Sequence, residues 1–343
     1  MVVFLFSDFR LGGSQKVAID IFNSLNKIKP NSKILTIQNE GILKKYIKSK
    51  NTISSLKSNR ALSSISTLYN YLSKNKPDKV FCTQPHLGIL VFIVNIFLIK
   101  KVKIIVRETN TSSYESFFDV SLKKRFENFL KKLLFNYINC VIFPSKEISY
   151  NLKSKNIIIP NFVDLSEIKK EKKSLKKNYI LAMGRLTKQK GFDILINAFL
   201  KINKKVKQNL FIFGEGEEKK NLINLIKKNN AESRIKILNF TNKTYSYLKS
   251  CDLFILSSRW EGMPNILIQA LSCRSNILST DCKFGPKQIL KNGKLGYLCK
   301  VNDVNSMSKK IIDALKKKKK ITYNDIVKYD KKKIIAQYLK IFI

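Results

Sequence analysis

The sequence predicts an α/β protein with two doubly wound domains. The chain has 343 residues, which is more than one ordinary α/β core contains. Short β-rich apolar runs alternate with helical patterns in both halves, a rhythm typical of parallel βαβ units. Hydrophobic residues make up 44% of the chain, so two cores can form and a disordered chain is excluded.

The first domain is predicted at residues 1–164. Its strands are expected at residues 2–6, 33–37, 79–83, 103–107 and 140–143. The apolar run at residues 87–99 is shorter than the roughly 20 residues that span a bilayer, so it predicts a buried helix. A charged stretch without glycine at residues 166–178 lacks apolar periodicity, and we expect the interdomain linker there.

The second domain is predicted at residues 178–328. Its strands are expected at residues 179–183, 210–213, 235–238, 253–256 and 276–279. In open parallel sheets, ligands bind outside the carboxyl ends of the strands. The loops that follow these strands are therefore the places where functional side chains are expected.

The net charge of the chain is +42. Such a charge attracts nucleic acid, anionic lipid and phosphorylated small molecules alike. A genome rich in Lys, Asn and Ile codons would give the same composition, and the charge does not decide between these explanations. A non-enzymatic, basic nucleic-acid-binding protein is therefore the alternative. No recognition helix, zinc-ligand spacing or aromatic-interleaved basic strand is visible, so no specific nucleic-acid partner is predicted.

The cysteines predict a reduced, cytoplasmic protein. Six of them occur singly, without metal-ligand spacing, and no secretory signal peptide precedes them. The sequence also lacks an Asp-x-Asp pair. No metal and no other cofactor is predicted.

Two loops carry the features of anion-binding sites. The first predicted strand leads through Gly12 and Gly13 into an apolar-periodic helix, where a ligand can approach the backbone and the free N–H groups of the helix start. In the second half, Gly184 and Arg185 end a strand, and Lys190 follows five residues after the arginine. A guanidinium and an ammonium at the mouth of a sheet can converge on a diphosphate.

A third loop, at residues 257–265, opens another helix and places Glu261 beside the single Trp of the chain. A Glu at the tip of such a loop can hold sugar hydroxyls. Gly262 and Pro264 shape a turn whose N–H groups are available to a ligand.

Taken together, these segments resemble glycosyltransferase family 4, the group 1 retaining sugar transferases with the fold called GT-B. The matching segments occur in the order of the family: Gly12-Gly13, Pro144-Ser145, residues 160–164, Gly184-Arg185-Leu186, Lys190-Gly191-Phe192-Asp193, Gly214-Glu215-Gly216, residues 257–265, and residues 285–296.

The resemblance implies two Rossmann-like domains that face each other across a cleft, with a C-terminal helix in residues 329–343 returning to the first domain. It implies a nucleotide diphosphate sugar as donor, more specifically a UDP-linked one, and a glycan or lipid-linked glycan as acceptor in cell-surface polysaccharide synthesis. Arg185, Lys190 and Glu261 are the implied catalytic residues. The implied donor-binding residues are Gly12, Gly13, Gly184, Gly262, Met263, Pro264, Asn265 and Gln269.

The sequence departs from the family in two places. Gln269 stands where the family has a second Glu, and it offers one acceptor oxygen without charge. The family also often has a His after the strand at residues 103–107, whereas this chain has Arg107 and Glu108 there and its single His, His86, after the preceding strand. We expect these three residues on the acceptor side, with His86 as a structural or acceptor contact instead of a catalytic base.

Residues 120–138 form a basic amphipathic pattern. The pattern predicts one helical face with Leu122, Phe126, Phe129, Leu130, Leu133, Leu134 and Tyr137, and an opposite face with Lys123, Lys124, Lys131 and Lys132. Such a helix either docks on its own sheet or lies on an anionic membrane. Peripheral contact with the inner face of the membrane is the second expectation.

A nicotinamide-dependent oxidoreductase is not favoured, because the three-glycine fingerprint is incomplete.

Overall fold

The computed structural model describes the chain except for residues 11, 59, 109–128, 130, 150–151 and 173–177. The chain divides into two compact units. Unit 1 comprises Met1–Asn161 and Lys332–Ile343, and unit 2 comprises Phe162–Lys331.

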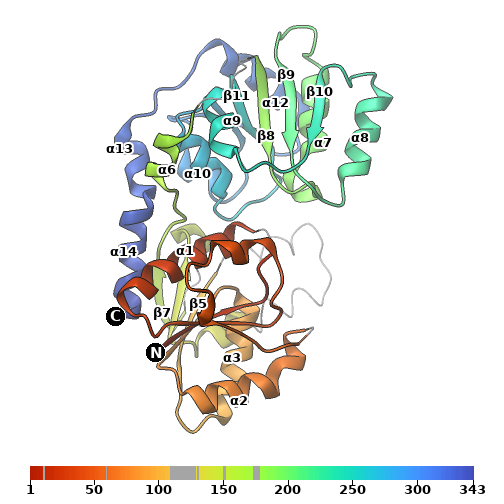
Figure 1. The fold of residues 1–343 in the computed structure, drawn as a ribbon. Coiled ribbons are helices and arrows are strands. Elements are labelled where there is room, and N and C mark those ends of the chain that lie inside the picture. The colour runs from red at the N-terminus through yellow and green to blue at the C-terminus, as the bar shows by residue number, and fades with distance from the viewer. Residues whose placement is uncertain (11, 59, 109–128, 130, 150–151, 173–177) are drawn as a thin grey trace. The chain divides into compact units, whose positions relative to one another are not determined.

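Unit 1 is built on a parallel sheet with the strand order β3-β2-β1-β4-β5-β6-β7 (Figure 1). The strands are β1 (Val2–Phe6), β2 (Lys33–Thr36), β3 (Ile53–Ser55), β4 (Lys79–Cys82), β5 (Lys103–Arg107), β6 (Cys140–Phe143) and β7 (Lys155–Ile158). Every residue of β1 is buried, because helices cover both faces of the sheet. The two edge strands, β3 and β7, were not expected from the sequence.

The named helices of unit 1 are α1 (Gly13–Ile28), α2 (Ile65–Asn75), α3 (Pro85–Phe97) and the C-terminal α14 (Lys331–Phe342). The Phe342 ring of α14 packs against Phe4 and Phe81, with ring centroids 5.4 Å apart in both pairs. The last helix is thus part of the core of unit 1. Helix α3 buries Leu87, Leu90, Val91 and Val94 as the sequence predicts, but its end leaves Phe97 70% exposed.

Unit 2 repeats the topology, with the strand order β10-β9-β8-β11-β12-β13 (Figure 1). Its strands are β8 (Tyr179–Met183), β9 (Asn209–Phe213), β10 (Ile235–Leu238), β11 (Leu253–Leu256), β12 (Ile277–Thr280) and β13 (Tyr297–Cys299). Its helices are α6 (Leu165–Lys170), α7 (Phe192–Leu200), α8 (Lys219–Lys228), α9 (Thr244–Ser250), α10 (Asn265–Ser272), α11 (Pro286–Ile289), α12 (Val304–Lys316) and α13 (Tyr323–Ile326).

Strand β8 shows how the sheet of unit 2 is covered. Ile180 and Ala182 belong to one core cluster with α7 and α12, while Tyr179, Leu181 and Met183 belong to a second cluster with α10. Alternate side chains of a strand point to opposite faces, so a continuous apolar run is required when both faces are buried. This requirement explains why the run at residues 179–183 is readable in the sequence.

The expected linker begins as a helix of unit 2, so that expectation was wrong for residues 166–170. The carboxylate of Asp164 accepts hydrogen bonds from the backbone N–H groups of Ser166 and Glu167, a cap that starts α6. Ile168 is buried in the core of unit 2, and the Lys249 ammonium donates to the Glu171 carbonyl at 2.6 Å. One buried apolar residue and a cap hold this short helix, which periodicity does not reveal.

The amphipathic prediction for residues 120–138 falls largely outside the described residues, including Lys123 and Lys124. Its described end contradicts the predicted faces. Lys131 is 6% exposed and pairs with the buried Glu108 at 2.9 Å, whereas Phe129 and Tyr137 are 58% and 72% exposed. The ion pair holds Lys131 inward, while Phe129, Leu133 and Tyr137 lie outward. Within the part of the chain that the structure describes, no helix is long and apolar enough to cross a membrane.

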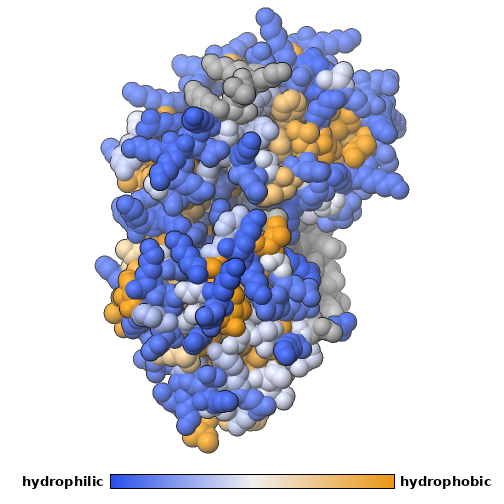
Figure 2. Space-filling model, viewed as in Figure 1, coloured by the Kyte–Doolittle hydropathy of each residue, from blue (hydrophilic) through white to orange (hydrophobic). Residues whose placement is uncertain are grey.

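Hydrophilic side chains cover most of the face shown in Figure 2, on both units. This wide distribution agrees with a charge that spreads along the whole sequence.

Candidate functional site

The strand order of unit 2 reverses between β8 and β11, which are hydrogen-bonded neighbours. Helix α7, which follows β8, and helix α10, which follows β11, belong to different core clusters on opposite faces of the sheet. Ligands of doubly wound sheets bind at this reversal, because the helices that follow the two strands leave to opposite faces and a crevice opens between their loops. The reversal brings together the loops at residues 184–191 and 257–264.

Hydrogen bonds fasten the two loops to each other. The Arg259 N–H donates to the Gln189 carbonyl at 2.7 Å, and the Gln189 side chain donates to the Trp260 carbonyl at 2.9 Å. The Ser257 hydroxyl donates to the Lys190 carbonyl at 2.8 Å. The backbone on both sides of Lys190 is therefore fixed against the β11 loop.

A bidentate ion pair holds the start of α7 to the same loop. The Arg259 guanidinium donates to both carboxylate oxygens of Asp193, at 2.9 and 2.6 Å, and to the Lys188 carbonyl at 2.7 Å. Such a fork fixes orientation better than a single contact. Arg259 and Asp193 are thus placed to position Lys190, a role that sequence reasoning missed.

Gly191 makes this close approach possible. Its φ is +61°, and a Cβ atom there would lie 2.3 Å from the Ser257 carbonyl oxygen. Any other residue would push the two loops apart and be strained in this conformation. The glycine after Lys190 is therefore a requirement of the loop contact.

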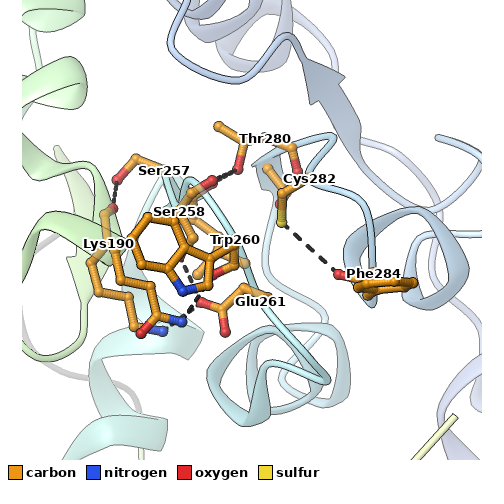
Figure 3. Close-up of polar contacts among 11 residues, drawn as sticks. Lys190, Ser257, Ser258, Trp260, Glu261, Thr280, Cys282 and Phe284 are labelled. Atoms are coloured by element: carbon orange, nitrogen blue, oxygen red, sulfur yellow. Dashed lines mark hydrogen bonds and ion pairs between the residues drawn. The ribbon is translucent and has the colours of Figure 1, made fainter. Parts of the chain in front are cut away.

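The centre of the site is an ion pair between Lys190 and Glu261. The Lys190 Nζ lies 2.5 Å from the Glu261 Oε1, and the two side chains are only 14% and 7% exposed. The Ser258 hydroxyl donates to the same oxygen at 2.6 Å, and the Thr280 hydroxyl holds the Ser258 carbonyl at 2.6 Å. Figure 3 shows the Lys190 and Glu261 side chains pointing toward one another. A carboxylate held in this way is fixed in place before any ligand binds.

The two loops carry further cations besides Lys190. Arg185 follows β8 and is exposed, while Arg259 is compensated by Asp193. Burial raises the pKa of the nearby Cys282 thiol to about 12, so this group stays neutral. Among the described residues, the Lys190 ammonium donates to Glu261 alone. Two of its three N–H groups are available to a ligand.

The other residues predicted in unit 2 lie on the same loops. Gly184 directly follows β8, and Gly262 follows Glu261. Met263 is 7% exposed and belongs to the core, so only its backbone can serve a ligand. Pro264 caps α10, whose first residue is Asn265. Gln269 is half-buried in the second turn of that helix.

In unit 1, the predicted residues follow three different strands. Gly12 caps α1, and Gly13 is its first residue. His86 lies in the first turn of α3 and contacts the Ser7 hydroxyl at 3.0 Å. Arg107 and Glu108 are 2% and 0% exposed.

Arg107 and Glu108 are engaged within unit 1. Arg107 donates to the Tyr338 hydroxyl at 3.0 Å and to the Asn161 side chain at 2.6 Å, and Glu108 pairs with Lys131. The contacts of Arg107 tie α14, through Tyr338, and Asn161, the last residue of the first segment of unit 1, to the sheet. These contacts assign Arg107 and Glu108 a structural task, and a contact with the acceptor stays a prediction.

Within the described ranges, no group of three or more His, Cys, Asp or Glu side chains is arranged to hold a metal ion.

Residues 164–333 match the family model described as glycosyl transferases group 1. A relative from Campylobacter jejuni, N-acetylgalactosamine-N,N'-diacetylbacillosaminyl-diphospho-undecaprenol 4-alpha-N-acetylgalactosaminyltransferase, is 30% identical over 60% of this chain. The poly(ribitol-phosphate) alpha-N-acetylglucosaminyltransferase of Staphylococcus aureus is 26% identical over 68% of this chain. The matches span 59% and 49% of the lengths of these two relatives.

The solved structure of HepE from Anabaena in complex with UDP and glucose has a TM-score of 0.83 to this chain. The two are 16% identical, and the likeness covers 99% of this chain and 98% of HepE. This likeness shows the fold, and the fold predicted from the sequence, GT-B, is confirmed.

We predict that the Lys190 and Glu261 charges are energetically coupled. Lys190→Met leaves the Glu261 carboxylate, which is 7% exposed, without its ammonium, and should lower the free energy of unfolding by about 3 kcal/mol. Adding Glu261→Gln removes the unpaired charge but keeps an acceptor for Ser258, so the double variant should recover most of the loss. Urea denaturation measures both values. Equal stability of the single and double variants would contradict the coupling.

Proposed function

We propose that this chain, which belongs to the group 1 glycosyl transferases, transfers a sugar from a nucleotide diphosphate sugar to a glycan or lipid-linked glycan in cell-surface polysaccharide synthesis. The observation that carries the proposal is the arrangement of Arg185, Lys190 and Glu261 at the strand-order reversal of unit 2. Two cations and one fixed carboxylate match a ligand with a diphosphate at one end and sugar hydroxyls at the other.

In the proposed reaction, the bond between the sugar and the diphosphate breaks, and negative charge grows on the departing phosphate oxygen. The planar guanidinium of Arg185 and the compact ammonium of Lys190 would stabilise the negative charge on the oxygens of this phosphate. Lys190 is only 14% exposed, so its interaction with the diphosphate is stronger than in water. Glu261 binds the donor sugar and, through the ion pair, holds the Lys190 ammonium in place.

The stereochemical part of the proposal is retention, with the acceptor hydroxyl attacking from the face that the diphosphate leaves. Such a reaction needs no nucleophile from the protein. A UDP-linked donor is supported by the fold shared with HepE, whose structure contains UDP and glucose. Gln269 offers the nucleotide ribose one acceptor oxygen, so we expect weaker ribose binding than a Glu would give.

The acceptor part of the proposal rests on the relatives. The C. jejuni relative is named for an undecaprenol-linked acceptor, and the S. aureus relative for poly(ribitol phosphate). We propose a cytoplasmic enzyme that meets a lipid-linked acceptor at the inner face of the membrane. Exposed apolar side chains at the end of α3, together with Phe129, Leu133 and Tyr137, support such contact.

Arg185→Ala and Lys190→Ala should each lower turnover at least about a hundredfold, the usual effect of removing a preorganised charge at a leaving group. Lys220→Ala, which removes an exposed charge from α8, is the matched control and should keep its activity. The effect is measured as the rate of sugar transfer from a panel of sugar nucleotides, monitored through the nucleotide that is released. Full turnover in the Arg185 or Lys190 variant would refute the site.

We expect transfer to proceed without a divalent metal, because Arg185 and Lys190 supply the positive charge that a metal would otherwise bring to the diphosphate. Excess chelator should leave the rate within about twofold of the untreated enzyme, since the protein cations remain. A loss of activity in chelator that manganese or magnesium restores would contradict this expectation.

Binding to anionic membranes should depend on the exposed apolar cluster formed by Phe97, Ile99 and Tyr137. Their exposed fractions are 70%, 101% and 72%, and the Phe92 and Tyr137 rings, 6.1 Å apart, show that the two segments are neighbours. Lys100 and Lys101 continue from the end of α3 and would face lipid phosphates.

The test is co-sedimentation with vesicles that contain phosphatidylglycerol. The triple change of Phe97, Ile99 and Tyr137 to Ser should release the protein at low salt, whereas Phe240→Ser, an exposed apolar residue of unit 2, should not. High salt should weaken wild-type binding, because screening acts within about 10 Å at ordinary ionic strength. Equal sedimentation of the triple variant would assign the contact to another surface.

A further inference from the structure

Unit 1 has its own reversal of strand order, between β1 and β4. Ser7 directly follows β1, and Gln84 and His86 follow β4. The Ser7 backbone is held by the end of β2, since its carbonyl accepts from the Gln38 N–H at 2.9 Å. The three side chains thus lie where a doubly wound sheet binds its ligand.

The hydrogen bonds of this cluster determine which ring nitrogen of His86 carries the proton. The Ser7 hydroxyl donates to the Gln84 Oε1 at 2.6 Å. A serine hydroxyl has a single hydrogen, so at its 3.0 Å contact with the His86 Nε2 the Ser7 oxygen accepts. With the Gln84 amide in this orientation, the contacts favour the tautomer in which Nε2 carries the proton and Nδ1 keeps a lone pair.

The surroundings of His86 favour the neutral ring. Desolvation of the ring lowers the pKa of His86 from its usual value, although the residue as a whole is exposed. The ring also lies in the first turn of α3, where the positive end of the helix dipole disfavours an imidazolium. A neutral cluster of hydroxyl, amide and imidazole suits a neutral hydroxyl better than a phosphate.

We propose that Ser7, Gln84 and His86 form a subsite that binds a hydroxyl group of the acceptor sugar, which donates its hydrogen bond to the Nδ1 of His86. The subsite rests on the proposed function, because it needs a sugar acceptor. Gln84 and Ser7 act as positioning residues: they fix the tautomer and the ring orientation through Nε2.

The single histidine of the chain makes the tautomer directly measurable. In protein labelled with ¹⁵N-histidine, the spectrum contains one imidazole, and at pH 7 we expect a protonated Nε2 and an unprotonated Nδ1. In Ser7→Ala the Nε2 resonance should shift, because the hydrogen-bond acceptor of its N–H is removed. A protonated Nδ1 or an imidazolium in the wild type would overturn the proposal without any assay of transfer.

Methyl glycosides of hexoses and N-acetylhexosamines serve as probes of the subsite. Titration should move the Nδ1 resonance and leave Nε2 protonated, and inorganic phosphate should not reproduce the shift. If these glycosides shift Nδ1 while no sugar nucleotide supports transfer, the subsite stands and the proposed function fails. If none of these glycosides moves the Nδ1 resonance up to its solubility limit, the proposed subsite is refuted.

Two substitutions separate a hydroxyl contact from a structural role. The amide oxygen of Asn can take the place of Nδ1, whereas the amide of Gln reaches the place of Nε2. His86→Gln should raise the KM for the acceptor about three- to tenfold, the usual effect of losing one neutral hydrogen bond, and His86→Asn should raise it less. An equal KM in the two variants, with transfer intact, would show that His86 only fills space at the start of α3.

Discussion

The constraint on which both candidate sites depend is the single reversal of strand order in each sheet. Right-handed crossovers send the helices on either side of the reversal to opposite faces. In unit 2 the two loops at the reversal are held together by one backbone hydrogen bond, from the Arg259 N–H to the Gln189 carbonyl, and by side chains: the Arg259 fork, the Gln189 amide and the Ser257 hydroxyl.

The same topology carries different chemistry in the two units. At the reversal of unit 2 the side chains are charged, with Lys190 and Glu261 largely withdrawn from water. At the reversal of unit 1 the side chains in contact, Ser7 between Gln84 and His86, are neutral. A charged site favours the diphosphate of a donor, and a neutral one favours the hydroxyl of an acceptor. The sequence supports this division, since its single His falls in unit 1.

The sequence reveals the elements whose residues are buried on both faces, and it misses those held by local contacts. Continuous apolar runs predict β8 and β11, because a doubly covered strand needs them. The edge strand β7 is mostly exposed, and α6 depends on one cap and Ile168, so neither has a pattern. Lys190 and Glu261 belong to two separate sequence motifs. Their contact joins residues 71 positions apart, and only the strand order brings them together.

The donor site has its own local charge balance, separate from the +42 of the chain. The Arg259 charge is matched by Asp193 and the Lys190 charge by Glu261, and the Arg185 guanidinium is exposed. Surface lysines farther than about 8 Å are screened at physiological salt, whereas a largely buried ammonium is not. Affinity for a diphosphate would therefore come from the largely buried Lys190 and from Arg185 on the same loop, and a chain with far fewer lysines could bind it equally well.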